Sequence, residues 1–102
     1  MLNEITVTEL KQKIEAGENI TLIDVREPYE HEEFNIGGLL IPLGEIGSHA
    51  DQIKELGETE IILYCRSGNR SAIALKMLVL QHQITNIANL KGGVIAWKEE
   101  TK

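Results

Sequence analysis

The segment Ile61-Ile62-Leu63-Tyr64-Cys65 limits the possible folds of this chain more than any other, because all five residues are hydrophobic. A strand with one wet face would alternate polar and apolar side chains, whereas an unbroken apolar run is typical of a central parallel strand covered on both faces. A polar loop at residues 66–70 follows, and Ser71–Gln81 then supplies strong helix formers with a wide apolar face. This succession of strand, tight loop and helix predicts an α/β fold.

The rest of the chain alternates strand-like and helix-like segments in the same way. Thr8 can cap a helix over Glu9–Ala16, and Gly17 can end it. Residues 20–25, which are rich in β-branched side chains, and residues 87–90 read as strands, and residues 39–42 form a short apolar piece. Together these segments predict one domain over residues 1–102, an open, mostly parallel sheet with helices on both faces.

Several single residues punctuate this pattern. Pro28 is placed to begin a helix, and the later amphipathic stretch that ends at Gly57 can turn Ile53 and Leu56 toward a core. Gly92-Gly93 is expected to supply a positive φ or a close backbone approach at a sharp strand-to-helix turn. Trp97, in the short helix that follows, is expected to anchor the core.

Charge and cysteine usage exclude several classes of function. With 16 acidic and 10 basic residues the net charge is −6, which argues against nucleic acid as a partner. No apolar run is long enough to span a bilayer, and the start lacks a secretory pattern, so no membrane partner is expected. A single cysteine forms no internal disulfide and suits a reducing compartment, which predicts a cytoplasmic protein.

No metal and no other cofactor is expected. His31 lies among acidic residues that lack the spacing of metal ligands, so this segment is predicted to form a solvated helix face. Those acidic residues are Glu27, Glu30, Glu32 and Glu33.

Cys65 is the candidate nucleophile, although a lone cysteine is often only a small buried hydrophobe. It closes the predicted central strand, and α/β sheets bind ligands at the carboxyl ends of their strands. Lowering a thiol pKa from about 8.5 to about 6.5 takes roughly 2.7 kcal/mol. Two amide hydrogen bonds to the charged sulfur, at roughly 1.5–3 kcal/mol each, would suffice. A histidine base is then unnecessary, and all three histidines lie outside the loop.

Two of the three arginines, Arg66 and Arg70, fall inside this five-residue loop of an acidic chain. The planar guanidinium group is well matched to oxyanions, so the loop is predicted to receive a small dianion beside a reactive sulfur. On this interpretation Arg70→Ala raises the KM for such a donor. The alternative is a pair of solvated surface arginines.

The run Cys65-Arg66-Ser67-Gly68-Asn69-Arg70-Ser71 resembles the active-site loop of single-domain rhodaneses, the thiosulfate sulfurtransferases. Residues 22–27 and 90–97 are similar to two further signatures of that family, so the resemblance covers nearly the whole chain. It implies a five-stranded doubly wound domain in which Cys65 takes a sulfane sulfur from thiosulfate, becomes a persulfide and passes the sulfur to cyanide or a thiol. It also implies that Arg66, Ser67, Gly68, Asn69 and Arg70 bind the substrate.

Supporting roles are expected for Asp24 and Arg26, at the end of the neighbouring strand, and for Ser71. Asp24 and Arg26 could hydrogen-bond the Cys65 loop or form a purely structural ion pair. The segment Phe34–Pro42 departs from the family pattern, because Asn35 stands where histidine is usual and the run is one residue shorter. This difference bears on donor preference.

Two alternative functions remain open. The chain could be a sulfur carrier or docking module whose Cys65 is loaded by a protein persulfide partner. Phosphatases and arsenate reductases have a similar loop with five residues between Cys and Arg, whereas only residues 66–69 separate Cys65 from Arg70. The shorter loop suits one extra sulfur atom better than a phosphate, so phosphatase activity ranks below sulfur transfer.

Overall fold

A single five-stranded sheet organises the chain in the computed structural model, which describes residues 3–101. Every neighbouring pair of strands is parallel, and the strand order is β1-β5-β4-β2-β3. The strands are β1 (Glu4–Ile5), β2 (Ile20–Asp24), β3 (Leu39–Leu40), β4 (Glu60–Tyr64) and β5 (Ile87–Leu90). The predicted α/β class and the five strands implied by the family resemblance are confirmed, and the sheet is wholly parallel.

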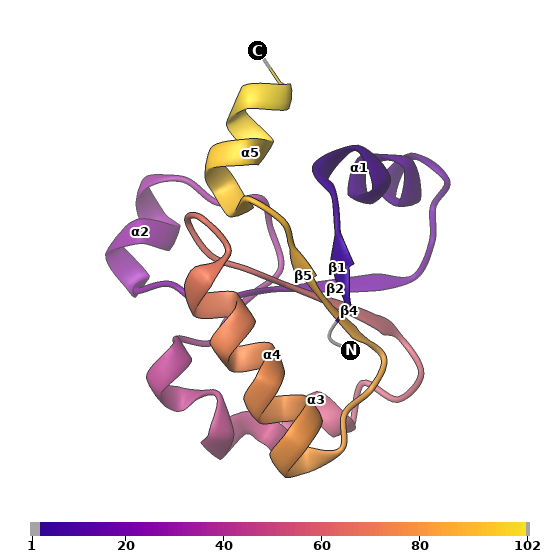
Figure 1. Ribbon diagram of the computed structural model, residues 1–102, viewed down its shortest axis with the longest axis vertical. Helices are drawn as coiled ribbons and strands as arrows, with labels where there is room; N and C mark the ends of the chain where they lie inside the picture. The colour runs from indigo at the N-terminus through magenta and orange to yellow at the C-terminus, as the bar shows by residue number, and fades with distance from the viewer. Residues whose placement is uncertain (1–2, 102) are drawn as a thin grey trace.

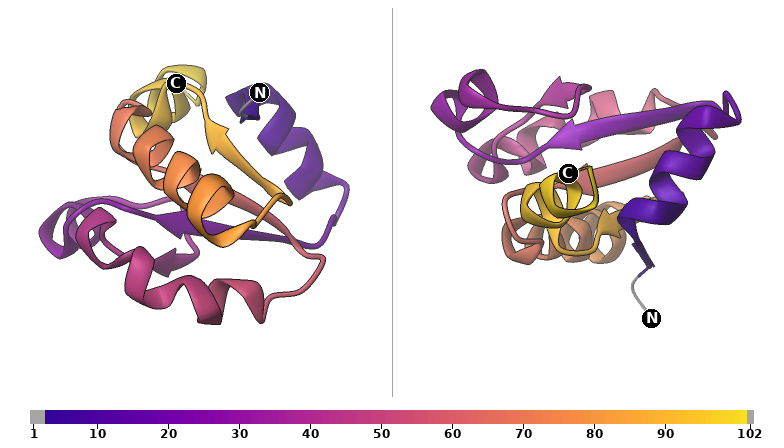
Figure 2. Two further views of the ribbon diagram at one scale, coloured as in Figure 1. Left: turned by 60° about the horizontal axis from the view of Figure 1, so that its bottom comes forward. Right: turned by 90° about the horizontal axis from the view of Figure 1, so that it is seen from above.

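Helices cover both faces of this sheet (Figures 1 and 2). The helices α1 (Val7–Glu15) and α5 (Gly93–Glu100) pack on one face, and α3 (Ala50–Lys54) and α4 (Asn69–His82) pack on the other. The short helix α2 (Pro28–Glu33) begins at Pro28 as predicted and lies beyond the end of the sheet, near the start of α4. Two 3-10 turns, Leu43–Glu45 and Gly47–His49, lead into α3.

The central strand β4 contributes to two separate cores. Ile61 and Leu63, with Cys65 directly after the strand, belong to the core under α3 and α4, whereas Ile62 and Tyr64 belong to the core under α1 and α5. Since neighbouring residues of a strand point to opposite faces, an unbroken apolar run fits a strand that is covered twice. Trp97 packs against the second core, as predicted, and Lys11 Nζ lies 5.0 Å from its ring centroid.

Helix starts differ from the sequence-based prediction at two places. Thr6, not Thr8, caps α1: its hydroxyl accepts from the amide of Glu9 at 3.1 Å, and the Glu9 carboxylate accepts from the Thr6 amide at 3.0 Å. This reciprocal capping box starts the helix earlier than expected. The helix α4 begins at Asn69 rather than Ser71, so Arg70 belongs to its first turn.

Strand β1 was not predicted, because two residues are too few to form a recognisable pattern. It joins the edge of the sheet through backbone hydrogen bonds. The backbone amide of Asn89 donates to the Asn3 carbonyl at 3.0 Å, and that of Lys91 donates to the Ile5 carbonyl at 2.8 Å. Across residues 3–101, no helix has both the length and the apolar character needed to cross a bilayer.

Candidate active site

Cys65 lies directly after β4, where the chain turns toward α4. Its Sγ accepts a hydrogen bond from the Gly68 amide at 3.1 Å, and the Ser71 amide lies 3.5 Å away. The Ser71 hydroxyl is 3.4 Å from the same sulfur. The side chain is nearly fully buried, with 1% exposed. Cys65 is therefore buried, as an inert cysteine would be, yet it is surrounded by hydrogen-bond donors.

These donors change the acidity of the thiol. Burial raises the pKa of Cys65, because a charged sulfur loses its hydration, but bonds from the Ser71 hydroxyl and from the amides of Ser71, Gly68 and Ser67 lower it. The donors outweigh burial, so the pKa lies below that of an ordinary thiol. Cys65 therefore ionises more readily than an ordinary thiol to the thiolate, which is the nucleophilic form of cysteine.

The start of α5 holds the other side of the loop. The amide of Val94 donates to the Cys65 carbonyl at 2.9 Å, and the amide of Ile95 donates to the Arg66 carbonyl at 3.0 Å. With these carbonyls bonded to α5, the amides further along the loop can face the sulfur.

Glycines make this close approach possible. Gly92 and Gly93 have φ of 77° and 56°, and a Cβ on Gly93 would lie 2.3 Å from the Cys65 carbonyl oxygen. Both the positive φ and the tight approach expected of this pair are confirmed. Gly68, with φ of 101°, turns the chain into α4.

Asn89 supports the loop from β5 and was missed by the sequence-based reasoning. Its Nδ2 donates to the Gly68 carbonyl at 3.1 Å, and its Oδ1 accepts from the Ser71 hydroxyl at 2.5 Å. Asn89 is 5% exposed, in a strand whose other residues are apolar. A buried amide inside an apolar strand was the available signal.

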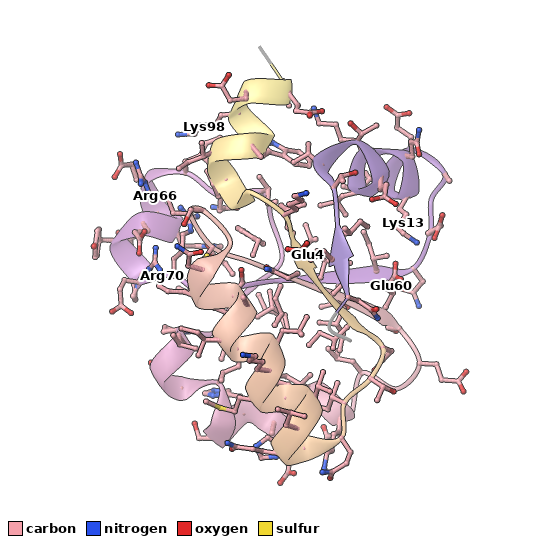
Figure 3. All side chains as sticks on the ribbon, viewed as in Figure 1. Glu4, Lys13, Glu60, Arg66, Arg70 and Lys98 are labelled. Atoms are coloured by element: carbon pink, nitrogen blue, oxygen red, sulfur yellow. The ribbon has the colours of Figure 1, made fainter. Side chains whose placement is uncertain are left out.

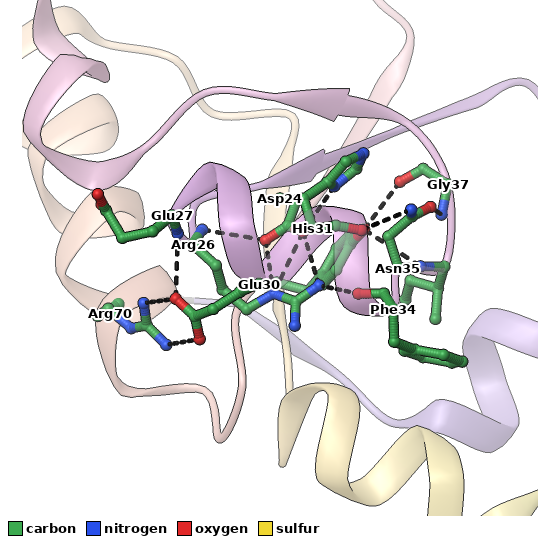
Figure 4. A network of polar contacts seen from close by, with 11 residues as sticks. Asp24, Arg26, Glu27, Glu30, His31, Phe34, Asn35, Gly37 and Arg70 are labelled. Carbon is green, nitrogen blue, oxygen red and sulfur yellow. Dashed lines mark hydrogen bonds and ion pairs between the residues drawn. The ribbon is translucent and has the colours of Figure 1, made fainter.

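The two loop arginines have different surroundings. Arg70 forms a two-pronged ion pair with Glu30 of α2, with Nη1 to Oε1 at 2.7 Å and Nη2 to Oε2 at 2.9 Å (Figure 4). Arg66 is exposed, and it lines a cleft of about 290 Å³ between α2 and α5 (Figure 3). Ser67 and Asn69 are exposed as well. The alternative interpretation, a pair of solvated surface arginines, therefore does not hold for Arg70, and the guanidinium group predicted to receive a donor oxyanion is already paired with Glu30.

Asp24 and Arg26 bond to each other at the end of β2. Arg26 Nε donates to Asp24 Oδ1 at 2.9 Å, and its Nη2 donates to Asp24 Oδ2 at 2.8 Å and to the Phe34 carbonyl at 2.6 Å. Burial raises the pKa of Asp24, but bonds from Arg26 and His31 outweigh it and hold this pKa below its usual value. Within residues 3–101 these two side chains form no hydrogen bond with the Cys65 loop, which matches the structural ion pair.

The predicted solvated face of α2 is wrong for two residues. His31 Nδ1 lies 2.9 Å from Asp24 Oδ2, and Glu30 is occupied by Arg70 (Figure 4). Both face the body of the protein because α2 lies against the ends of β2 and α4. In the described part of the chain, no group of three or more His, Cys, Asp and Glu side chains is arranged to hold a metal ion.

Asn35 shapes a turn after α2. Its Nδ2 donates to the His31 carbonyl and its Oδ1 accepts from the Gly37 amide, both at 2.9 Å. Tyr64 donates from its hydroxyl to the Gly37 carbonyl at 2.9 Å and fixes the same segment to β4. The turn beside α2 is therefore held by several hydrogen bonds.

Comparison with known proteins decides the family. The family model described as "Rhodanese-like domain" matches residues 6–100. The chain belongs to this family. A solved structure of a rhodanese-related protein from Thermoplasma volcanium is similar to this rhodanese-like chain, with a TM-score of 0.72 and 30% identity, over 96% of this chain and 92% of that one.

Curated relatives of the rhodanese-like chain carry names that refer to sulfur transfer. It is 38% identical to "Putative sulfurtransferase YtwF" of Bacillus subtilis (strain 168), over 99% of this chain and 95% of that protein. It is 35% identical to a protein named "Sulfurtransferase" of Allochromatium vinosum, over 95% and 89%. It is also 34% identical to "Putative sulfur carrier protein YrkF" of Bacillus subtilis (strain 168), but there it spans only 52% of the relative's length.

Proposed function

We propose that this rhodanese-like chain is a sulfurtransferase that moves a sulfane sulfur, from thiosulfate or a persulfide donor, through a persulfide on Cys65. The observation that carries the proposal is the set of donors around Sγ, with the Gly68 amide at 3.1 Å and the Ser71 amide at 3.5 Å. Amides at this position stabilise a negative charge on sulfur both before and after the sulfur is loaded. Relatives named for sulfur transfer support the same reaction.

In the first step the Cys65 thiolate attacks the outer sulfur of the donor. With thiosulfate, a lone pair of Sγ forms the new S–S bond, and the bond between the outer sulfur and the sulfonate breaks with its electron pair leaving on sulfite. Thiolate and thiosulfate dianion thus become a Cys65 persulfide anion and sulfite dianion, with three negative charges on each side. No external oxidant or reductant is needed.

In the second step a thiophilic acceptor attacks the outer sulfur of the persulfide. Cyanide takes the outer sulfur and becomes thiocyanate, or a thiolate takes it and becomes a new persulfide. The electron pair of the broken Sγ–S bond stays on Sγ, so Cys65 is again a thiolate. The Gly68 and Ser71 amides hold the charge again at that point. Two successive half-reactions on one residue predict ping-pong kinetics.

The other residues of the loop have separate roles in this proposal. Exposed Arg66 is placed to attract an anionic donor toward the loop, and Ser67 and Asn69 are exposed beside it. Gly68 supplies the amide and Ser71 adds its amide and hydroxyl. We propose the cytoplasm as the location, because a persulfide-forming cysteine requires a reduced thiol.

A sulfur-carrier role is the second candidate, and the name of the relative YrkF favours it. In that case a protein partner loads Cys65, and turnover of free thiosulfate is only incidental. The two functions differ in kinetics: an enzyme of free thiosulfate shows saturable turnover, whereas a carrier shows a very high KM for thiosulfate beside fast transfer from a partner persulfide.

The test is steady-state formation of thiocyanate from cyanide with thiosulfate or with a persulfide as donor. We expect wild-type protein to turn over at least one donor with ping-pong kinetics, and Cys65→Ser to lose turnover with all donors. Full turnover by Cys65→Ser would refute the mechanism. The ratio of kcat/KM for the two donor classes then separates enzyme from carrier.

A further inference from the structure

Glu30 occupies the guanidinium group that the loop would otherwise offer to an anionic donor. Both terminal nitrogens of Arg70 bond to the two carboxylate oxygens, at 2.7 and 2.9 Å. A planar carboxylate fills the same two-pronged position that a donor oxyanion would take. The Glu30 side chain is 14% exposed and that of Arg70 is 35% exposed, so solvent only partly weakens the pair.

The start of α2 fixes the Glu30 carboxylate in this place. Its Oε1 also accepts from the Glu27 amide at 3.1 Å, and Pro28 begins the helix between these two residues. Hydrogen bonds from Arg70 hold the pKa of Glu30 at about 2. The carboxylate is therefore charged over the whole physiological pH range, and because it is part of the chain, a donor must displace it every time.

The neighbouring cleft offers little compensating positive charge. Of the cations that line it, Arg26 is already paired with Asp24, which leaves Arg66 and Lys98. Glu33 and Glu99 line the same cleft. The cleft is therefore lined by side chains of both charges and is not a positive pocket that would by itself select a dianion.

We propose, on the basis of the sulfur transfer proposed above, that Glu30 is a positioning residue that sets donor preference: by occupying Arg70 it disfavours small dianionic sulfur donors and favours donors of low charge, such as persulfides. With a persulfide donor, the Cys65 thiolate attacks the outer sulfur of R–S–SH and forms the new Sγ–S bond, while the bond between the two donor sulfurs breaks and R–S⁻ leaves with its electron pair. The proton stays on the transferred sulfur, so the product on Cys65 is the persulfide Sγ–SH and one negative charge stands on each side. The donor as written is neutral and the leaving thiolate carries one negative charge, so no dianion has to approach the Glu30 carboxylate.

Arg70→Ala alone does not test this idea. It raises the KM for thiosulfate if Arg70 binds the donor, and it also raises this KM if removal of Arg70 leaves an unpaired carboxylate on Glu30. The informative change is Glu30→Gln, which keeps the shape and the bond from the Glu27 amide but removes the charge that opposes Arg70.

The experiment compares thiosulfate, a dianion, with methanethiosulfonate, a monoanion that also carries a sulfane sulfur. We expect Glu30→Gln to lower the KM for thiosulfate about threefold or more, since one charged contact at a partly exposed site is worth about that factor. The KM for methanethiosulfonate should fall less. Glu32→Gln, the same charge change at an exposed residue of the same helix, should leave both values close to wild type.

The double variant Glu30→Gln/Arg70→Ala decides whether Arg70 mediates the effect, and its KM for thiosulfate should return to the wild-type value or above. A purely structural role of the ion pair predicts the opposite sign for Glu30→Gln, because loosening the site raises KM. The proposal is overturned if Glu30→Gln raises or does not change the KM for thiosulfate, if Glu32→Gln matches it, or if the gain persists without Arg70. If wild-type protein forms no persulfide on Cys65 with any sulfane donor, the proposed function itself is refuted.

Discussion

The hydroxyl of Ser71 donates to Oδ1 of Asn89 at 2.5 Å and lies 3.4 Å from Sγ of Cys65. A hydroxyl has one proton, so Ser71 cannot serve both acceptors at once. Because a charged acceptor binds a donor more strongly than a neutral one, ionisation of Cys65 draws this proton toward the sulfur. Asn89 thus keeps the hydroxyl beside the thiol until a charge develops there.

Replacing Asn89 tests how much it supports the loop. Asn89→Leu removes the partners of the Gly68 carbonyl and the Ser71 hydroxyl inside the protein, and we expect unfolding free energy to fall by about 1–3 kcal/mol. Urea denaturation measures this. Asn19→Leu, at an exposed amide bonded to Thr59, should cost about 0.5 kcal/mol or less. Equal losses in the two variants would count against a supporting role.

Ser71→Ala should make Cys65 harder to ionise. Ultraviolet absorbance of the thiolate against pH should show the wild-type transition below the usual thiol pKa and the Ser71→Ala transition at higher pH than wild type, because one donor to the charged sulfur is lost. Alkylation of Cys65 should accelerate over the same pH range. In Ser67→Ala the backbone amide near the sulfur is retained, so its curve should overlay the wild-type curve. A Ser71→Ala curve that coincides with the wild-type curve would show that the Ser71 hydroxyl does not lower the pKa of Cys65.

Gly93→Ala should disrupt the loop by collision. The new Cβ would lie 2.3 Å from the Cys65 carbonyl oxygen, whereas at Gly17, which also has a positive φ, nothing lies within 4 Å. Gly17→Ala should therefore cost only the left-handed strain of about 1–2 kcal/mol, and Gly93→Ala should cost more and reduce sulfur transfer. Thermal melts and turnover assays measure both, and similar losses at the two glycines would contradict the close approach.

Acid should weaken the link between α2 and α4. The pKa of Glu30 falls from 4.5 to about 2 in the folded protein. A group whose folded pKa is depressed adds stability that is fully present above the unfolded value and is lost as pH falls toward the folded value. Wild-type protein should therefore lose its stability advantage over Glu30→Gln between about pH 5 and pH 2. A constant difference across that range in denaturation experiments would argue against the charged pair.

The parts of the fold that follow from local pattern were predictable. The apolar run at residues 61–65 indicated a doubly covered strand, and Gly92-Gly93 indicated the turn that brings α5 against the loop. The capping box at Thr6 was also within reach, because Glu9 follows at the required spacing of three.

The contacts that define the surroundings of Cys65 were not predictable in this way. Arg70 and Glu30 are 40 positions apart, and Asn89 follows Ser71 by 18 positions, so only the parallel strand order brings them together. The sequence pattern predicted that Arg70 binds the donor, because its acidic partner Glu30 cannot be recognised without the fold. The same holds for His31, which reaches Asp24 only because α2 lies against the end of β2.

The proposed sulfur transfer depends most on Sγ of Cys65, the atom that carries the sulfur. Protein incubated with a sulfane donor, trapped with iodoacetamide and digested with trypsin should yield the peptide of residues 55–66, the one containing Cys65, with one extra sulfur beside the alkyl group. Cyanide added before trapping should remove that sulfur. Failure of this peptide to gain sulfur from thiosulfate, methanethiosulfonate or a persulfide would contradict the account.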